Sequence, residues 1–191
     1  AAGTRDASRR AMPTLYSKVK LLDHPVHPML AAFPIALFTA TLFGFVAYLI
    51  DGDRDWFRLG YAANLAGVVT ALAAAVPGFL DWIGIPDHVR AKRVGLVHMV
   101  LNLIVVTTFA INLGAQGAQL DEARPEGVVA VVLSTLGVVL LLASGYFGWS
   151  LVQTHHVGVD LSKEQQLLDR ERSHPDQTQE PQGMPHAPHL P

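Results

Sequence analysis

Residues 127–152, GVVAVVLSTLGVVLLLASGYFGWSLV, run without a charged side chain. Three further stretches, 29–50, 59–86 and 94–116, are similarly apolar, and Asp81 is the only acidic or basic residue in the four runs. A helix rises about 1.5 Å per residue, so about 20 residues cross a hydrocarbon core about 30 Å thick. A water-soluble bundle is the disfavoured alternative, because such runs leave no polar stripe to face water. The sequence therefore predicts an all-α integral membrane protein with four spans.

Short connections between the runs predict an up-down-up-down four-helix bundle. We expect a basic lead-in over residues 1–22, a transmembrane domain over 23–160, and a polar C-terminal segment over 161–191 that holds a short helix and a flexible tail rich in proline and histidine. Both termini then fall on one side of the membrane, together with eleven lysines and arginines, against three on the other side. Because basic loops stay inside, this predicts a multi-pass protein of a bacterial inner membrane with both termini in the cytoplasm.

Histidines gather at that same end of the predicted bundle. They precede the first run, lie near the start of the third and follow the fourth, while an aspartate lies near the end of the second. Ionisable groups in or beside membrane spans are rare unless they pair, conduct or bind something. The residues predicted to share this layer are His24, His27, Asp81, His98, His155 and His156.

The chain has no cysteine, which excludes thiolate metal sites, iron–sulfur clusters and covalently attached haem. Neutral imidazole binds zinc, copper, nickel and iron, and it is an axial ligand of haem b. One hypothesis is therefore a haem b held by His27, His98 and His155. In that site Gly95 would leave room for the flat macrocycle, and Asn102 would orient a ring or bind a propionate. The other hypothesis is a metal ion held by five residues: His24, His27, Asp81, His98 and His155.

Each of these residues also has an interpretation without a cofactor. His24 and His27 could cap the first helix, and His98 could form a hydrogen bond between helices. His155 suits the negative C-terminal end of the fourth helix. Asp81 could pair with a cation of the 87–93 loop. The layer would then hold only its own hydrogen bonds, and His88 on that loop is expected to be a surface residue.

Three stretches of the sequence resemble the DUF2231 family of predicted four-span bacterial membrane proteins. They are DHPVHPML at 23–30 with FPIAL at 33–37, GFLDW at 78–82 with Gly95, His98 and Asn102, and HHVGVD at 155–160. The resemblance covers residues 23–160 and implies that five positions belong to the family pattern: His24, His27, Asp81, His98 and His155. His156 replaces a residue that is commonly small in the family. Fusions of some relatives with Rieske iron–sulfur domains imply electron transfer.

Together these features predict a membrane subunit that binds haem b or a metal ion and serves electron transfer within a membrane complex. The alternative is a non-catalytic accessory subunit of a larger membrane complex. In both cases the partners are the lipid bilayer and other membrane subunits, with the C-terminal tail as a contact. A third hypothesis is an ion path through Asn64, Asn102 and Asp81. No nucleophile–base pair, phosphate loop or nucleic-acid-binding stripe stands out, so we predict no catalytic residues and no nucleic-acid partner, and the sequence assigns no enzymatic activity to the isolated chain.

Overall fold

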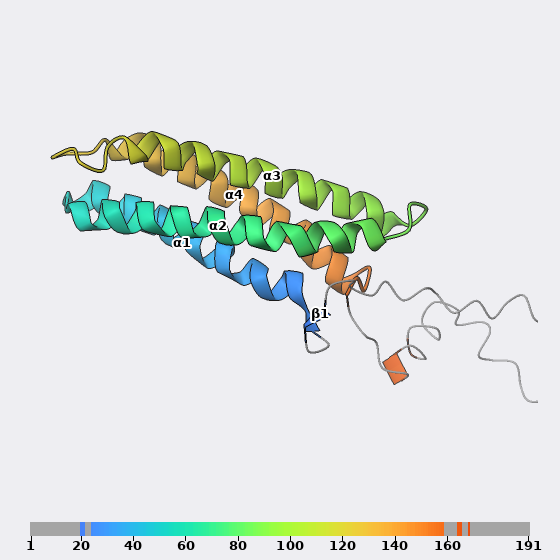
Figure 1. Ribbon diagram of the computed structural model, residues 1–191. Helices are drawn as coiled ribbons and strands as arrows, with labels where there is room; N and C mark the ends of the chain where they lie inside the picture. The colour runs from blue at the N-terminus through green and yellow to red at the C-terminus, as the bar shows by residue number, and fades with distance from the viewer. Residues whose placement is uncertain (1–19, 22–23, 159–163, 166–167, 169–191) are drawn as a thin grey trace, which may run out of the picture. The chain divides into compact units, whose positions relative to one another are not determined.

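Over its described residues, the computed structural model contains four long helices, whose arrangement is shown in Figure 1. They are α1 (Val26–Asp51), α2 (Arg54–Gly84), α3 (Arg90–Gly117) and α4 (Gly127–Gln153), and a two-residue antiparallel pair, β1 (Lys20–Leu21) and β2 (His24–Pro25), precedes them. The structure describes residues 20–21, 24–158, 164–165 and 168, and of residues 20, 21, 24 and 25 it describes the backbone alone. The predicted lead-in over 1–22, and the short helix and tail over 161–191, therefore lie almost wholly outside the described residues.

All four helices are long and apolar enough to cross a membrane, so the predicted fold class is confirmed. Three of them begin earlier than the apolar runs do: α1 starts at Val26, α2 at Arg54 and α3 at Arg90, and the first turns of α2 and α3 carry charged residues. In α2 the side chain of Asp53 accepts a hydrogen bond of 2.9 Å from the backbone N–H of Asp55, and this cap starts the helix at Arg54. The apolar run marks the part of the helix within the membrane, whereas the cap fixes where the helix begins.

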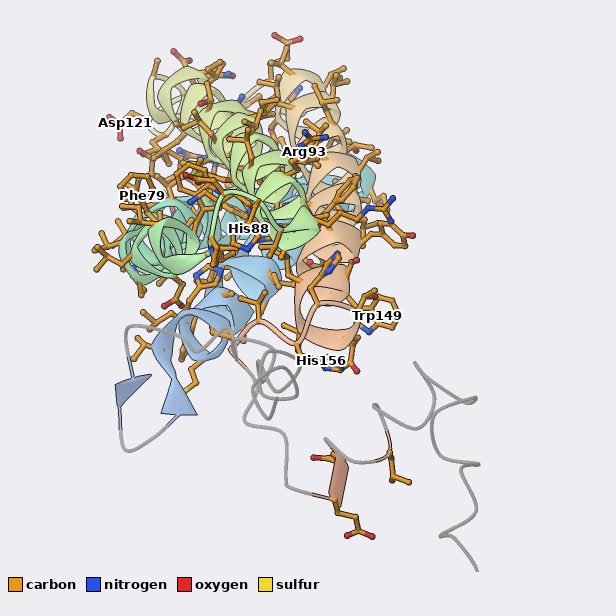
Figure 2. All side chains as sticks on the ribbon, turned by 90° about the vertical axis from the view of Figure 1, so that its right-hand side faces the viewer. Phe79, His88, Arg93, Asp121, Trp149 and His156 are labelled. Carbon is orange, nitrogen blue, oxygen red and sulfur yellow. The ribbon has the colours of Figure 1, made fainter. Side chains whose placement is uncertain are left out.

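The bundle consists of two helical hairpins. α1 packs most extensively on α2, and α3 on α4, while the contacts from one hairpin to the other are fewer. Figure 2 views the bundle from the end at which α1 and α3 begin, and the four helices follow one another around a ring in chain order. Phe79 projects outward from α2, and Trp149 projects from α4 on the opposite side. The looser packing between the hairpins leaves space between them.

The buried interior changes character along the bundle. In the middle lies an apolar layer in which the rings of Phe38 and Phe109 stack at 3.8 Å, both at most 1% exposed. Farther from the histidines, buried amides and a hydroxyl form a hydrogen-bonded cluster. Asn112 donates to Ser134 Oγ at 2.9 Å, and Gln116 donates to Asn112 Oδ1 at 3.2 Å. The histidines occupy the end at which α1 and α3 begin.

The second hairpin repeats the first at a nearly constant offset in the sequence. His98 and Phe109 of α3 follow His27 and Phe38 of α1 by 71 residues each. Because α1 and α3 both begin at the same end, the two hairpins have the same direction (Figure 1). Repeats of this kind are a common way to build membrane proteins. The repeat brings equivalent histidines and equivalent phenylalanines face to face.

The second helices of the two hairpins repeat as well. Gly137 follows Gly67 by 70 residues, and both are followed by two valines. A Cβ atom on Gly67 would lie 2.7 Å from the ring of Phe38, and one on Gly137 would lie 2.5 Å from the ring of Phe109. Each glycine therefore leaves space for the phenylalanine ring of its own hairpin, and the same glycine–phenylalanine packing occurs in both hairpins.

Candidate cofactor site

A cavity of about 490 Å³ lies between the two hairpins and is lined by residues of all four helices. Its walls carry His27 from α1 and His98 from α3. Several lining residues, among them Leu72, Phe79 and Leu103, are exposed on the outside of the bundle, so the cavity extends to the surface that faces lipid. Its volume lies within the range of about 300–1,000 Å³ that is usual for small-molecule and cofactor sites.

His27 lies in the first turn of α1 and is fixed by α2. Its Nδ1 lies 2.8 Å from the backbone oxygen of Ala74, so Nδ1 carries the proton and donates it. A Cβ atom on Gly78 would lie 2.7 Å from the imidazole ring, so only glycine leaves space for it there. His27 therefore reaches across to α2 and does not cap α1, and its Nε2 keeps a free lone pair in this tautomer.

His98 is held in the same way within the second hairpin. Its Nδ1 lies 2.9 Å from the backbone oxygen of Ser144 on α4, and a Cβ atom on Gly148 would lie 2.9 Å from the ring. The helix-to-helix hydrogen bond considered from the sequence is therefore present. In addition, Asn102 donates from Nδ2 to Nε2 of His98 at 3.0 Å and to its backbone oxygen at 3.0 Å. Of the two roles predicted for Asn102, the structure supports the orientation of the ring.

The two imidazole rings face each other across the cavity. Their centroids are 6.3 Å apart, and their planes are inclined at 80°. One ring belongs to each hairpin, so a group bound between the rings would bridge the two halves of the bundle.

Gly95 lines the cavity, but for a different reason from the one predicted. A Cβ atom on this residue would lie 2.8 Å from Cδ1 of Trp82. The indole of Trp82 donates from Nε1 to the backbone oxygen of Lys92 at 3.1 Å, and the ammonium group of Lys92 lies 4.0 Å from the indole centroid. The space at Gly95 is therefore filled by Trp82 and is not open to a macrocycle.

The remaining predicted site residues come together only in part. Asp81 lines the cavity, whereas His155 is not among the described residues that line it. The chain turns back after α4, and the backbone N–H of His155 donates to the oxygen of Ser150 at 3.2 Å. The side chain of His24 lies outside the described residues. His88 is exposed at the end of the bundle, as predicted (Figure 2).

The five-residue metal site expected from the sequence is not assembled by the described side chains. Among them, no three histidine, aspartate or glutamate residues are close enough to hold a metal ion. The predicted ion path through Asn64, Asn102 and Asp81 also meets the apolar Phe38–Phe109 layer, because Asn64 lies beyond it and donates to the backbone oxygen of Phe109 at 3.2 Å. The site thus reduces to a pair of histidines.

The hydrogen-bond acceptors of this pair could not be found from side-chain types. Backbone oxygens of Ala74 and Ser144 accept the hydrogen bonds that fix the two rings. Every residue has a backbone oxygen, so the sequence does not indicate which one acts as an acceptor. Gly78 and Gly148 did carry a signal, since both follow the repeated glycine–valine–valine by a constant spacing. Aligning the two halves of the chain would have identified them.

The fold and the site define an integral membrane four-helix bundle, built from two hairpins, with a histidine pair facing a cavity between them. A family model described as "Predicted membrane protein (DUF2231)" matches residues 23–161, which is most of the chain, and the protein belongs to this family. Searches of curated proteins and of solved structures gave no match.

Proposed function

We propose that this membrane protein binds haem b between His27 and His98 and transfers electrons through it. The observation that carries the proposal is the symmetric histidine pair, with ring centroids 6.3 Å apart, one on each hairpin. Redox-active iron in such a position would exchange electrons without any bond being made or broken in the protein chain.

The number of ligands favours haem over a bare metal ion. A structural zinc site takes four protein ligands and a catalytic one takes three. The described residues offer two imidazoles and no group of three. Iron in haem needs two axial ligands at most from the protein, because the macrocycle supplies the other four.

The separation of the rings supports the same choice. If the bond from zinc to imidazole nitrogen, about 2.0–2.1 Å, is taken for iron, two such bonds span about 4 Å. The ring centroids are 6.3 Å apart. Subtracting the two bonds leaves about 1 Å on each side, which is the room for the distance from Nε2 to the centroid of its own ring. The distance between the centroids is therefore compatible with both Nε2 atoms binding one iron.

The hydrogen bonds at Nδ1 have the form expected of histidine ligands. A ligating histidine usually donates its other ring N–H to a carbonyl or carboxylate, which fixes the tautomer and raises the basicity of the ligating nitrogen. His27 and His98 both donate from Nδ1 to a backbone oxygen. Nε2 is therefore the nitrogen left for iron in both rings, although at His98 the amide of Asn102 would have to release it.

Electron transfer through a haem within the membrane requires a donor and an acceptor. We therefore include in the proposal further membrane subunits as partners, with the C-terminal tail as a contact. The excess of basic residues beside the histidine end supports a bacterial inner-membrane protein with that end and both termini in the cytoplasm.

An absorption spectrum and a metal analysis of the protein purified from bacterial membranes test the proposal. We expect a Soret band, equimolar haem, and the loss of both in folded His27→Ala and His98→Ala variants. His88→Ala is the control and should keep both, because its side chain is exposed outside the cavity. A wild-type protein without a Soret band would overturn the proposal, and an equimolar metal in that protein would favour a bare ion instead.

A further inference from the structure

The two histidines make the same main contacts within their hairpins, as the repeat requires. Each lies on the first helix of its hairpin, and each donates from Nδ1 to a backbone oxygen of the second helix. Each ring also packs against a glycine, Gly78 or Gly148, that leaves no room for a Cβ atom. Apart from the hydroxyl of Ser144, which lies 3.1 Å from Nδ1 of His98 and has no counterpart at Ala74, these contacts are the same for both histidines.

A single amide breaks this equivalence at the Nε2 atoms. Asn102 follows His98 by four residues, and the residue in the matching position after His27 is Ala31. Both N–H groups of the Asn102 amide are engaged, one with Nε2 of His98 and one with its backbone oxygen. Among the described residues, Nε2 of His27 has no hydrogen-bond donor of this kind. Both asparagine and alanine line the cavity.

We propose that Asn102 makes His98 the exchangeable one of the two axial ligands, so that a small neutral ligand such as carbon monoxide binds iron on the His98 side. The inference rests on the proposed haem site and adds to it an open coordination position. In such an exchange, Nε2 of His98 would give up its bond to the iron and the carbon of carbon monoxide would take its place. No electron is transferred, and no proton leaves the ring.

Asn102 would make His98 exchangeable because its amide and the iron compete for the same lone pair, the one on Nε2 of His98. The lone pair on Nε2 of His98 can bind iron or accept a hydrogen from the amide, but not both. When the bond to iron breaks, the amide captures Nε2, while the hydrogen bond to Ser144 keeps the ring beside the cavity. One hydrogen bond of ordinary strength favours the dissociated ring by a factor of about 2 to 13.

Stopped-flow mixing of the reduced, haem-loaded protein with carbon monoxide tests the inference. The wild-type protein should bind carbon monoxide, and Asn102→Ala should bind it about 2- to 13-fold more slowly. Ala31→Asn, which gives His27 the matching amide, should bind it faster than the wild type. Thr107→Ala is the control, because this exposed threonine of α3 does not line the cavity, and its rate should equal the wild-type rate.

A second measurement follows the hydrogen bond itself. In ¹⁵N nuclear magnetic resonance spectra of the protein without haem, Asn102→Ala should shift the Nε2 resonance of His98 and leave that of His27 in place. Equal carbon monoxide rates in all variants with a normal Soret band, or an unchanged His98 resonance, would overturn the role of Asn102 alone. A missing Soret band in the wild type would overturn the haem proposal and this inference with it.

Discussion

Replacing Gly148 with alanine places a methyl group against the ring of His98. The new Cβ atom would lie 2.9 Å from Cε1 and 3.3 Å from Nδ1 of that ring. The ring cannot retreat freely, because Nδ1 is bonded to the backbone oxygen of Ser144 at 2.9 Å. Gly145, one turn earlier on the same helix, offers a matched control, since a Cβ atom there has no neighbour within 4 Å.

The expected difference between the two variants follows from two terms. Overpacking costs about 1–3 kcal/mol, and loss of the hydrogen bond costs about 0.5–1.5 kcal/mol. Exchange of glycine for alanine inside a helix favours folding by about 1 kcal/mol, but this gain is common to both variants and cancels. Gly148→Ala should therefore be less stable than Gly145→Ala by about 1.5–4.5 kcal/mol.

Equilibrium unfolding of the two variants in mixed micelles measures this difference, and an absorption spectrum measures the haem that each retains. Gly148→Ala should also lose haem absorbance, whereas Gly145→Ala, whose new methyl group meets no protein atom but lines the cavity, is the control for stability alone. Equal stabilities and equal spectra would show that the ring of His98 does not lie against Gly148, and the description of the second hairpin would then be wrong.

The other predictions concern residues around the site and at the far end of the bundle. His155→Ala should keep the full Soret band in an absorption spectrum, because this residue does not line the cavity; loss of the band would restore it as a ligand. Ser144→Ala should keep the band as well, since Nδ1 of His98 lies nearer to the backbone oxygen of Ser144, at 2.9 Å, than to its hydroxyl, at 3.1 Å, and a lost band would give the hydroxyl the larger role. Tyr48→Phe removes the buried O–H that donates to the oxygen of Pro125 at 2.6 Å, so unfolding in mixed micelles should show a loss of about 1–3 kcal/mol with an unchanged spectrum. An unfolding free energy equal to that of the wild type would remove this link between α1 and the α3–α4 loop.

The fold followed from the sequence because membrane spans are defined by length and composition. Four apolar runs predicted four helices, and short loops predicted their antiparallel order. The helix ends were less predictable, since the start of α2 depends on the cap at Asp53, which lies outside the apolar run. The bundle order also brought His27 and His98 to one end, where the structure places both.

Which residues line the site could not be predicted in full, because it depends on three-dimensional contacts that the spacing of residues in the sequence does not specify. His155 was expected beside His98, but the turn after α4 sets its position, and a histidine count says nothing about that turn. Gly95 was expected to leave room for a macrocycle, whereas the group that lies against it is the indole of Trp82. The repeat can be detected in the sequence alone. Considering only histidines that occur at equivalent positions in both halves would have reduced the predicted ligands to one histidine from each hairpin.

The electron paramagnetic resonance spectrum of the oxidised, purified protein reports the axial ligands of its iron. Ligation by His27 and His98 predicts a low-spin ferric signal typical of two imidazoles, and the loss of that signal in either alanine variant. A high-spin signal in the wild-type protein, or a low-spin signal that survives in His27→Ala, would show that the two histidines do not share one iron.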